Sequence, residues 1–154
     1  MNEPLRKCRI CGLEAWTEKE LEYFSKFKES KYGRDTLCKK CKNQLCKKSE
    51  DKIKLKALQK LSRDGFPRCL VCGFSDDIRF LQIDHIKNDG NKDLTSGGKR
   101  YKGKDIYRKI LNMPIEEARS KYQVLCAFHN WAKRFGKTGA EYKVIVLESP
   151  EGDD

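Results

Sequence analysis

Pairs of cysteines constrain the fold of this chain more than any other feature of its sequence. Six of the eight cysteines form three C-x-x-C pairs, of which the first two are Cys8/Cys11 and Cys38/Cys41. Two pairs separated by an insert of this size are typical of a closed zinc site, because four thiolates satisfy zinc tetrahedrally. A redox-active C-x-x-C is the alternative, but two pairs within one short segment favour metal. The sequence therefore predicts a four-cysteine zinc module over residues 1–47.

A second metal site is predicted from the third pair. Cys69 and Cys72 are followed far downstream by Cys126-x-x-His129, and an imidazole can replace a thiolate without changing the tetrahedral preference of zinc. The alternative is that His129 is an ordinary helix residue and the site has three ligands. We expect ligation, because position 129 is where a fourth cysteine would stand. Cys46 is left over and is expected to be a free thiol.

The composition explains why metal ions are needed. Of the 154 residues, 38% are apolar and 37% are charged, so the core is thin and we expect two structural zinc ions to stabilise it. No apolar run follows Met1, and no stretch is long enough to cross a membrane. These features predict a reducing, cytoplasmic location, where thiols favour metal over disulfides. A secreted disulfide-linked scaffold is the alternative.

The charge of the chain favours a polyanionic partner. The formal net charge is +11, and four acids are concentrated in the tail, at Glu148, Glu151, Asp153 and Asp154. The rest of the chain is therefore more basic still. Each lysine or arginine that contacts a phosphate releases a counterion, so such a body suits nucleic acid.

A helix is predicted between the two cysteine-rich segments, with Ser49 as its N-cap and an end at Asp64-Gly65. Its buried face is expected to carry apolar residues at helical spacing, namely Ile53, Ala57, Leu58 and Leu61. The opposite face is expected to be a solvated surface of lysines, namely Lys52, Lys54, Lys56 and Lys60. In the first segment, Leu21, Phe24 and Phe27 are expected to pack over the metal site.

The second half of the chain reads as strand, polar excursion, strand and helix. A strand over 79–83 leads into Asp84-His85, and the excursion contains two short helices, over 105–112 and 116–121. A strand over 122–125 then leads into Cys126. The closing elements are expected to be a helix over 128–135 and an edge or dimer strand over 142–147.

Closing the second zinc site would bring Asp84 and His85 close to Asn130. Oxygen ligands from Asp84 and Asn130 suit Mg²⁺ or Mn²⁺, and an unligated imidazole at His85 could take a proton from water. Alternatively, the Asp-His pair is incidental and Asn130 caps a helix. Adjacent strand residues point to opposite faces, so Asp84 and His85 can serve one phosphate only if the strand ends, twists or bulges there.

Three motifs together resemble HNH nucleases of the ββα-metal type, especially the recombination endonuclease VII group and zinc-bearing HNH restriction and homing enzymes. They are Cys69-x-x-Cys72-Gly73, Ile83-Asp84-His85 and Leu125-Cys126-x-x-His129-Asn130. The resemblance covers about half of the chain. It implies a divalent-metal-dependent DNA endonuclease that leaves 5′-phosphate and 3′-hydroxyl ends. In it Asp84 and Asn130 would hold one catalytic cation, His85 would be the general base, and the final helix would lie against the DNA backbone.

The expected fold is accordingly small α+β and zinc-stabilised. Its parts are a four-cysteine module over 1–47, a connecting helix over 48–65, and an HNH domain over 66–138 with a long insertion between its strands. A C-terminal strand and acidic tail follow over 139–154.

The sequence departs from the resembling family at two places. His129 stands where such zinc-bearing proteins usually have cysteine. The middle asparagine of many HNH motifs is missing, because Ser120, Lys121 and Tyr122 occupy its region. Asn88, Asn91 or a backbone carbonyl could orient His85 instead.

Basic residues beside the final helix and in the excursion are the candidate DNA contacts. They are Lys133, Arg134, Lys137, Lys99, Arg100 and Lys102. Trp131 and Phe135, four residues apart, are expected to be core residues rather than base-stacking ones.

The predicted function is therefore cleavage of DNA, expected to be double-stranded. One nuclease centre per chain favours a homodimer for double-strand cutting, whereas a monomer could nick. A zinc-stabilised nucleic-acid-binding protein without catalysis and a thiol oxidoreductase are the alternatives. Restriction, homing, phage DNA processing and junction resolution could all use such a site, and the sequence does not separate them.

Overall fold

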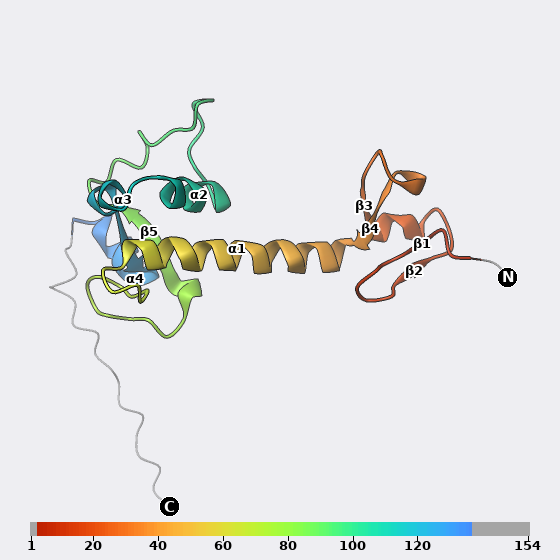
Figure 1. Ribbon diagram of the computed structural model, residues 1–154, viewed down its shortest axis with the longest axis horizontal. Helices are drawn as coiled ribbons and strands as arrows, with labels where there is room; N and C mark the ends of the chain where they lie inside the picture. Colours follow the sequence, from red (N-terminus) through yellow and green to blue (C-terminus); the bar gives the residue numbers. More distant parts are fainter. Residues whose placement is uncertain (1–2, 137–154) are drawn as a thin grey trace, which may run out of the picture. The chain divides into compact units, whose positions relative to one another are not determined.

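Short antiparallel strand pairs and one long helix form the framework of this small α+β protein. The computed structural model describes residues 3–136, and the chain divides into two compact units, Met1–Lys52 and Ile53–Asp154. In the described residues the strands form three separate two-stranded antiparallel sheets (Figure 1). The expected strand over 142–147 and Lys137 lie outside the described residues.

The first unit is built on two small sheets. Its elements are β1 (Arg6–Lys7), β2 (Glu14–Ala15), the 3-10 turn η1 (Glu20–Tyr23), β3 (Phe24–Lys26), η2 (Lys31–Gly33) and β4 (Arg34–Cys38). Strand β1 pairs with β2 and β3 pairs with β4. Leu21 and Phe24 are buried together with three of the cysteines, as predicted. Phe27 is 49% exposed, so its predicted packing over the metal site is wrong.

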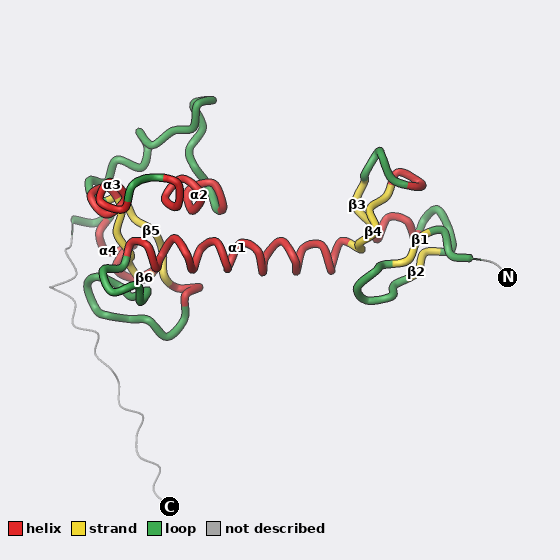
Figure 2. The backbone as a smooth tube through the Cα atoms, in the orientation of Figure 1, coloured by secondary structure: helices red, strands yellow, loops and turns green. Residues whose placement is uncertain are grey.

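The long helix α1 (Lys39–Leu61) begins directly after β4 (Figure 2). The prediction of a start at Ser49 is wrong, because the helix already contains Cys41 and continues through a run of good helix formers such as lysine, glutamine and leucine. Its buried face is the one that the apolar spacing predicts: Ala57 and Leu58 are fully buried and Leu61 is nearly so.

Lys60 of α1 is not part of a purely solvated face. Its Nζ donates to the carbonyl of Leu111 at 2.8 Å and to that of Met113 at 2.5 Å. These carbonyls lie at the end of a later helix, where backbone acceptors lack intrahelical partners and a cation is favourable. The predicted solvated role is therefore wrong for Lys60, which ties two helices together.

The second unit is organised around a hairpin-like pair of strands. Its elements are η3 (Ile78–Phe80), β5 (Leu81–His85), α2 (Lys104–Asn112), α3 (Ile115–Lys121), β6 (Tyr122–Cys126) and α4 (Ala127–Lys133). Strand β5 starts two residues later than expected, because Asp77 caps a 3-10 turn by accepting from the backbone of Arg79 at 2.8 Å. The predicted positions of α2, α3 and β6 are close to those observed.

The pairing of β5 with β6 is regular along its whole length. Leu81 lies opposite Cys126, and the register runs without a shift to His85 opposite Tyr122. The core beneath this pair combines Leu58 of α1, Leu81 of β5 and Ile110 of α2 with buried residues of β6.

Within residues 3–136, no helix is both long and apolar enough to span a membrane.

Leu58→Ala should destabilise the second unit by about 2–5 kcal/mol, because a fully buried leucine leaves a cavity that its surroundings fill only in part. The change can be measured by urea unfolding of the zinc-loaded protein. Leu70→Ala is the matched control: Leu70 belongs to the same unit but is 70% exposed, so its loss should cost less than about 0.5 kcal/mol. Equal effects of the two substitutions would contradict this assignment of the core.

Candidate functional site

The four cysteines of the first unit converge on one point. The sulfur atoms of Cys8, Cys11, Cys38 and Cys41 all lie within 4.8 Å of one another, so they could hold a metal ion. The sulfurs of Cys11 and Cys38 are 3.7 Å apart. Four thiolates at the usual zinc–sulfur distance would lie roughly 3.8 Å apart around a tetrahedral ion. The donor set and its spacing therefore fit zinc.

The second cluster consists of Cys69, Cys72, Cys126 and His129, with their ligand atoms again within 4.8 Å of one another. The Nδ1 atom of His129 lies 3.1 Å from the sulfur of Cys126 and 3.6 Å from that of Cys69. His129 is 3% exposed. Its Nδ1 thus lies where it could supply the fourth ligand to a metal ion, as the spacing predicts.

Both clusters use the same backbone turn. The amide of Gly12 donates to the carbonyl of Cys8 at 2.9 Å, and the amide of Gly73 donates to that of Cys69 at 2.9 Å. Each glycine has a φ of 74°, in the left-handed region that residues with a Cβ rarely adopt. The turn directs both sulfurs of a pair to one side, which is the geometry that a metal site requires.

The ionisation of the thiols also favours a bound cation. Burial alone would raise the pKa of Cys8, but backbone N–H groups of Cys11 and Cys38 outweigh it and lower that pKa to about 6. Burial and the neighbouring sulfurs raise the pKa of Cys41 to about 12. Neighbouring thiolates repel one another, so the four crowded thiols resist losing all of their protons together. A divalent cation bound between them removes this repulsion.

Helix α4 follows the second cluster directly. The sulfur of Cys126 caps its first turn by accepting from the backbone of His129 at 3.5 Å. The next residue, Asn130, donates from its side chain to Gln82 of β5. One turn later, Lys133 donates to Asp84 of β5 at 2.5 Å. The contacts of Asn130 and Lys133 therefore place α4 along the face of β5 that carries Gln82 and Asp84.

Asp84 is held by two donors on this face. Its Oδ2 accepts from Lys133 and, at 2.7 Å, from the side-chain amide of Gln123 on β6. The ammonium of Lys133 also donates to the carbonyls of His85 at 2.6 Å and Ile86 at 3.1 Å. Three oxygens thus surround one positive charge. Asp84 and Asn130 share this face, but each is hydrogen-bonded to other residues.

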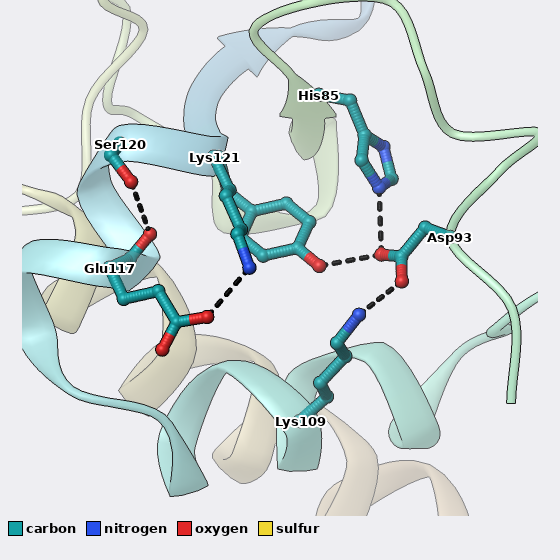
Figure 3. Close-up of polar contacts among 7 residues, drawn as sticks. His85, Asp93, Lys109, Glu117, Ser120 and Lys121 are labelled. Carbon is teal, nitrogen blue, oxygen red and sulfur yellow. Dashed lines mark hydrogen bonds and ion pairs between the residues drawn. The ribbon is translucent and has the colours of Figure 1, made fainter. Parts of the chain in front are cut away.

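His85 uses the opposite face of the strand. Its Nε2 lies 2.9 Å from Oδ2 of Asp93 (Figure 3), and its ring packs edge-on against Tyr122, with centroids 4.9 Å apart. The alternation of a regular strand therefore separates the side chains of Asp84 and His85. Strand β5 ends at His85, so the two side chains flank its terminus.

Asp93 is the partner of His85 that could not be identified from the sequence. Its carboxylate accepts hydrogen bonds from Tyr122 at 2.5 Å and from Lys109 of α2, and it lies within hydrogen-bond distance of His85. Burial would raise the pKa of Asp93, but hydrogen bonds from Lys109, Tyr122 and His85 outweigh it and lower that pKa to about 2. The partner that accepts a hydrogen bond from the imidazole is thus Asp93, and not Asn88 or Asn91.

These residues line a cavity of about 370 Å³ on the His85 side of the sheet. Four lysines line it, namely Lys87, Lys92, Lys109 and Lys121, and they outnumber the two lining acids, Asp89 and Asp93. Lys121 is paired with Glu117 at 2.6 Å, and Ser120 donates to the backbone of Glu117 (Figure 3). A cavity of this charge suits an anionic group such as phosphate.

The other candidate DNA contacts differ in their surroundings. Lys99, Arg100 and Lys102 are exposed, on a loop in which Leu94 forms an isolated bridge with Arg100. Arg134 is exposed at the end of α4. Lys133 is 20% exposed in its side chain and is held by Asp84.

Trp131 and Phe135 are not core residues. They are 58% and 62% exposed, and their rings contact each other at a tilt of 58°, with centroids 4.8 Å apart. The prediction was wrong because helical spacing shows that two side chains share a face but not which way that face points.

Comparisons with protein-family models, curated proteins and solved structures find no match for the chain.

Cys126→Ser should remove one of two zinc ions per chain and unfold the second unit, because the free energy of metal binding is also free energy of folding here. Metal analysis and backbone hydrogen exchange would show both effects, with protection kept in the first unit. Cys46→Ser is the control, since Cys46 is exposed and outside both clusters. Retention of both zinc ions by Cys126→Ser would show that the ligand assignment is wrong.

Proposed function

We propose that this protein is a divalent-metal-dependent DNA endonuclease of the HNH, ββα-metal type. The observation that carries the proposal is the Cys69/Cys72/Cys126/His129 cluster, which joins the Cys69–Cys72 turn to the end of β6 and to α4, while β5 pairs with β6. That unit carries Asp84 and Asn130 on one face and His85 at the strand end. Two clusters with the chemistry of zinc sites support a structural role for two zinc ions.

The oxygen atoms around Lys133 support the metal part of the proposal. The Oδ2 of Asp84 and the carbonyls of His85 and Ile86 already hold a positive charge at 2.5 to 3.1 Å. Hard oxygen donors of this kind suit Mg²⁺ or Mn²⁺. Bound by Asp84 and Asn130, such an ion would stabilise negative charge on the leaving oxygen.

The imidazole of His85 supplies the base. It takes a proton from water, the water oxygen bonds to phosphorus, and the bond from phosphorus to the 3′ oxygen breaks. The 3′ oxygen then takes a proton from solvent, so the ends are a 5′-phosphate and a 3′-hydroxyl. Because Asp84 and His85 use opposite faces of β5, the scissile phosphate must lie at the end of the strand, which both side chains flank.

The charges near this strand end suit a DNA backbone. Lysines line the cavity beside His85, and exposed Arg100 and Arg134 offer further positive charge. Double-stranded DNA is the proposed partner. A single centre per chain would require two copies to cut both strands.

A second candidate function is nucleic-acid binding without catalysis. The observation that favours it is the ammonium of Lys133, which already neutralises Asp84 and would have to move for a divalent cation to bind. The two candidates differ in whether metal reaches Asp84 and whether DNA is cut.

His85→Ala should lower the rate of plasmid cleavage by about 10²–10⁴-fold, which is the usual contribution of a general base. Binding to the same plasmid should be unchanged, because phosphate contacts come from lysines and arginines. The assay compares zinc-loaded wild type and variant with and without added Mg²⁺, and ligation of the products tests for 5′-phosphates. If wild type binds but never cuts, the second candidate is correct. Unchanged cutting by His85→Ala would remove His85 from the mechanism.

Lys133→Ala should let Mn²⁺ bind more tightly, by about fivefold to tenfold, because it removes a partly buried ion pair worth about 1 kcal/mol. Titration calorimetry on the zinc-loaded protein measures the affinity. Arg134→Ala is the control, since Arg134 is the exposed neighbour and the change of charge is the same. Equal Mn²⁺ affinity in wild type, Lys133→Ala and Asp84→Ala would show that no divalent cation binds at Asp84.

A further inference from the structure

One carboxylate gathers three donors from three different elements of the second unit. Asp93, in the loop between β5 and α2, is contacted by His85 from β5, Tyr122 from β6 and Lys109 from α2 (Figure 3). Only 13% of the Asp93 side chain is exposed. A buried acid in an otherwise polar loop is costly unless it is paired, and here an imidazole, a hydroxyl and an ammonium group all pair with the carboxylate of Asp93.

The charge state of Asp93 decides which nitrogen of His85 carries the proton. With a pKa of about 2, Asp93 is ionised and can only accept hydrogen bonds. Burial and the charge of Asp93 raise the pKa of Tyr122 to about 12, so the tyrosine hydroxyl stays protonated and donates. The Nε2 of His85 must therefore be a donor as well. In the neutral imidazole the free lone pair is then on Nδ1.

The Nδ1 edge of the His85 ring lies close to the backbone of the loop at Gly90. A methyl group built on Gly90 would lie 2.9 Å from Nδ1 and 3.2 Å from Cε1 of His85, so the backbone at Gly90 lies against this edge. In the described residues, the buried polar atoms without a partner are Nε of Arg6 and Nε2 of His129. Nδ1 of His85 is not among them, and the His85 side chain is 22% exposed.

We propose that Asp93 is the positioning residue of His85, an assignment that rests on the proposed function. The carboxylate fixes the Nε2–H tautomer and the ring plane, so that Nδ1 presents its lone pair to water. Tyr122 and Lys109 hold the carboxylate in turn. Asp93 takes no part in bond making, and it acts through the imidazole alone.

The tautomer can be observed without any activity, because the chain has only two histidines. In protein labelled with ¹⁵N-histidine, wild type should show a slowly exchanging Nε2 proton on His85. In Asp93→Ala that proton should be lost to exchange with water, while His129 is unchanged and serves as the internal control. A His85 Nε2 proton that stays protected in Asp93→Ala overturns the proposal, whatever the nuclease assay shows.

Kinetics separate positioning from a purely structural role. Asp93→Ala should lower kcat for plasmid cleavage by about 10–100-fold with KM unchanged, because orientation of a base affects the chemical step. Asp93→Glu should restore part of the loss. Asp89→Ala is the matched control: Asp89 lines the same cavity, and its removal changes the charge equally. Zinc content is measured for every variant.

The outcomes distinguish this proposal from the proposed function. If His85→Ala is inactive but Asp93→Ala cuts at the wild-type rate, the positioning role is overturned and the endonuclease assignment stands. If wild type does not cut at all, the endonuclease assignment fails, and the Nε2 proton still decides whether Asp93 holds the imidazole.

A second variant reaches the imidazole without touching the acid. Gly90→Ala would place its methyl group against Nδ1 and so displace the ring. It should reduce kcat by a factor similar to that of Asp93→Ala. Gly97→Ala is the control, because the nearest atom to its new methyl group would be 3.9 Å away. Full activity of Gly90→Ala would overturn the requirement for a fixed ring position.

Discussion

The attachment of the Cys69–Cys72 turn to β6 and α4 is the constraint on which the second unit depends. A pair of five-residue strands is only marginally stable by itself in water, and the seven-residue α4 is shorter than helices that are stable alone. The amide of Leu70, between the two cysteines, donates to Val124 of β6 at 2.9 Å. Four ligands on one ion would therefore fix the turn, the strand end and the helix start together. A thin apolar core could then be sufficient, because a bound metal would supply stability that hydrophobic burial otherwise has to supply.

The same attachment determines which residues face each other. Because Asn130 follows the ligand His129 directly, its side chain is brought over β5, beside Gln82. The two-residue period of the strand then places Asp84 on the side of α4 and His85 on the side of α2. An ordinary strand would keep such neighbours apart. In the proposed function, the termination of β5 at His85 would let both side chains serve one phosphate group.

Sequence reasoning works here where the chemistry is local. Metal-ligand spacing is sufficient to identify both clusters, and apolar spacing identifies the buried face of α1 and the positions of α2, α3 and β6. It fails where the outcome depends on distant partners. The start of α1 was missed because a C-x-x-C pair usually implies a loop, whereas Cys41 lies inside a helix. Asp93 could not be singled out, since the same loop contains Asp89 and the donors of Asp93 lie 8, 16 and 29 residues away. Lys60 and Lys133 looked like surface cations for the same reason.

The long segment between β5 and β6 is best understood as the support of His85. A minimal strand–strand connection would need only a few residues, yet this one carries α2, α3 and the loop with Asp93. Tyr122 and Lys109 both approach Asp93, so the carboxylate is neutralised by a lysine and oriented by a hydroxyl before it meets the imidazole. An asparagine in its place would have one acceptor oxygen instead of two and no negative charge, so it would leave the charge of Lys109 uncompensated in a site that is largely buried. In the proposed function, an acid supplied by the segment between β5 and β6 therefore suits this site better than an asparagine, because the acid compensates the charge of Lys109.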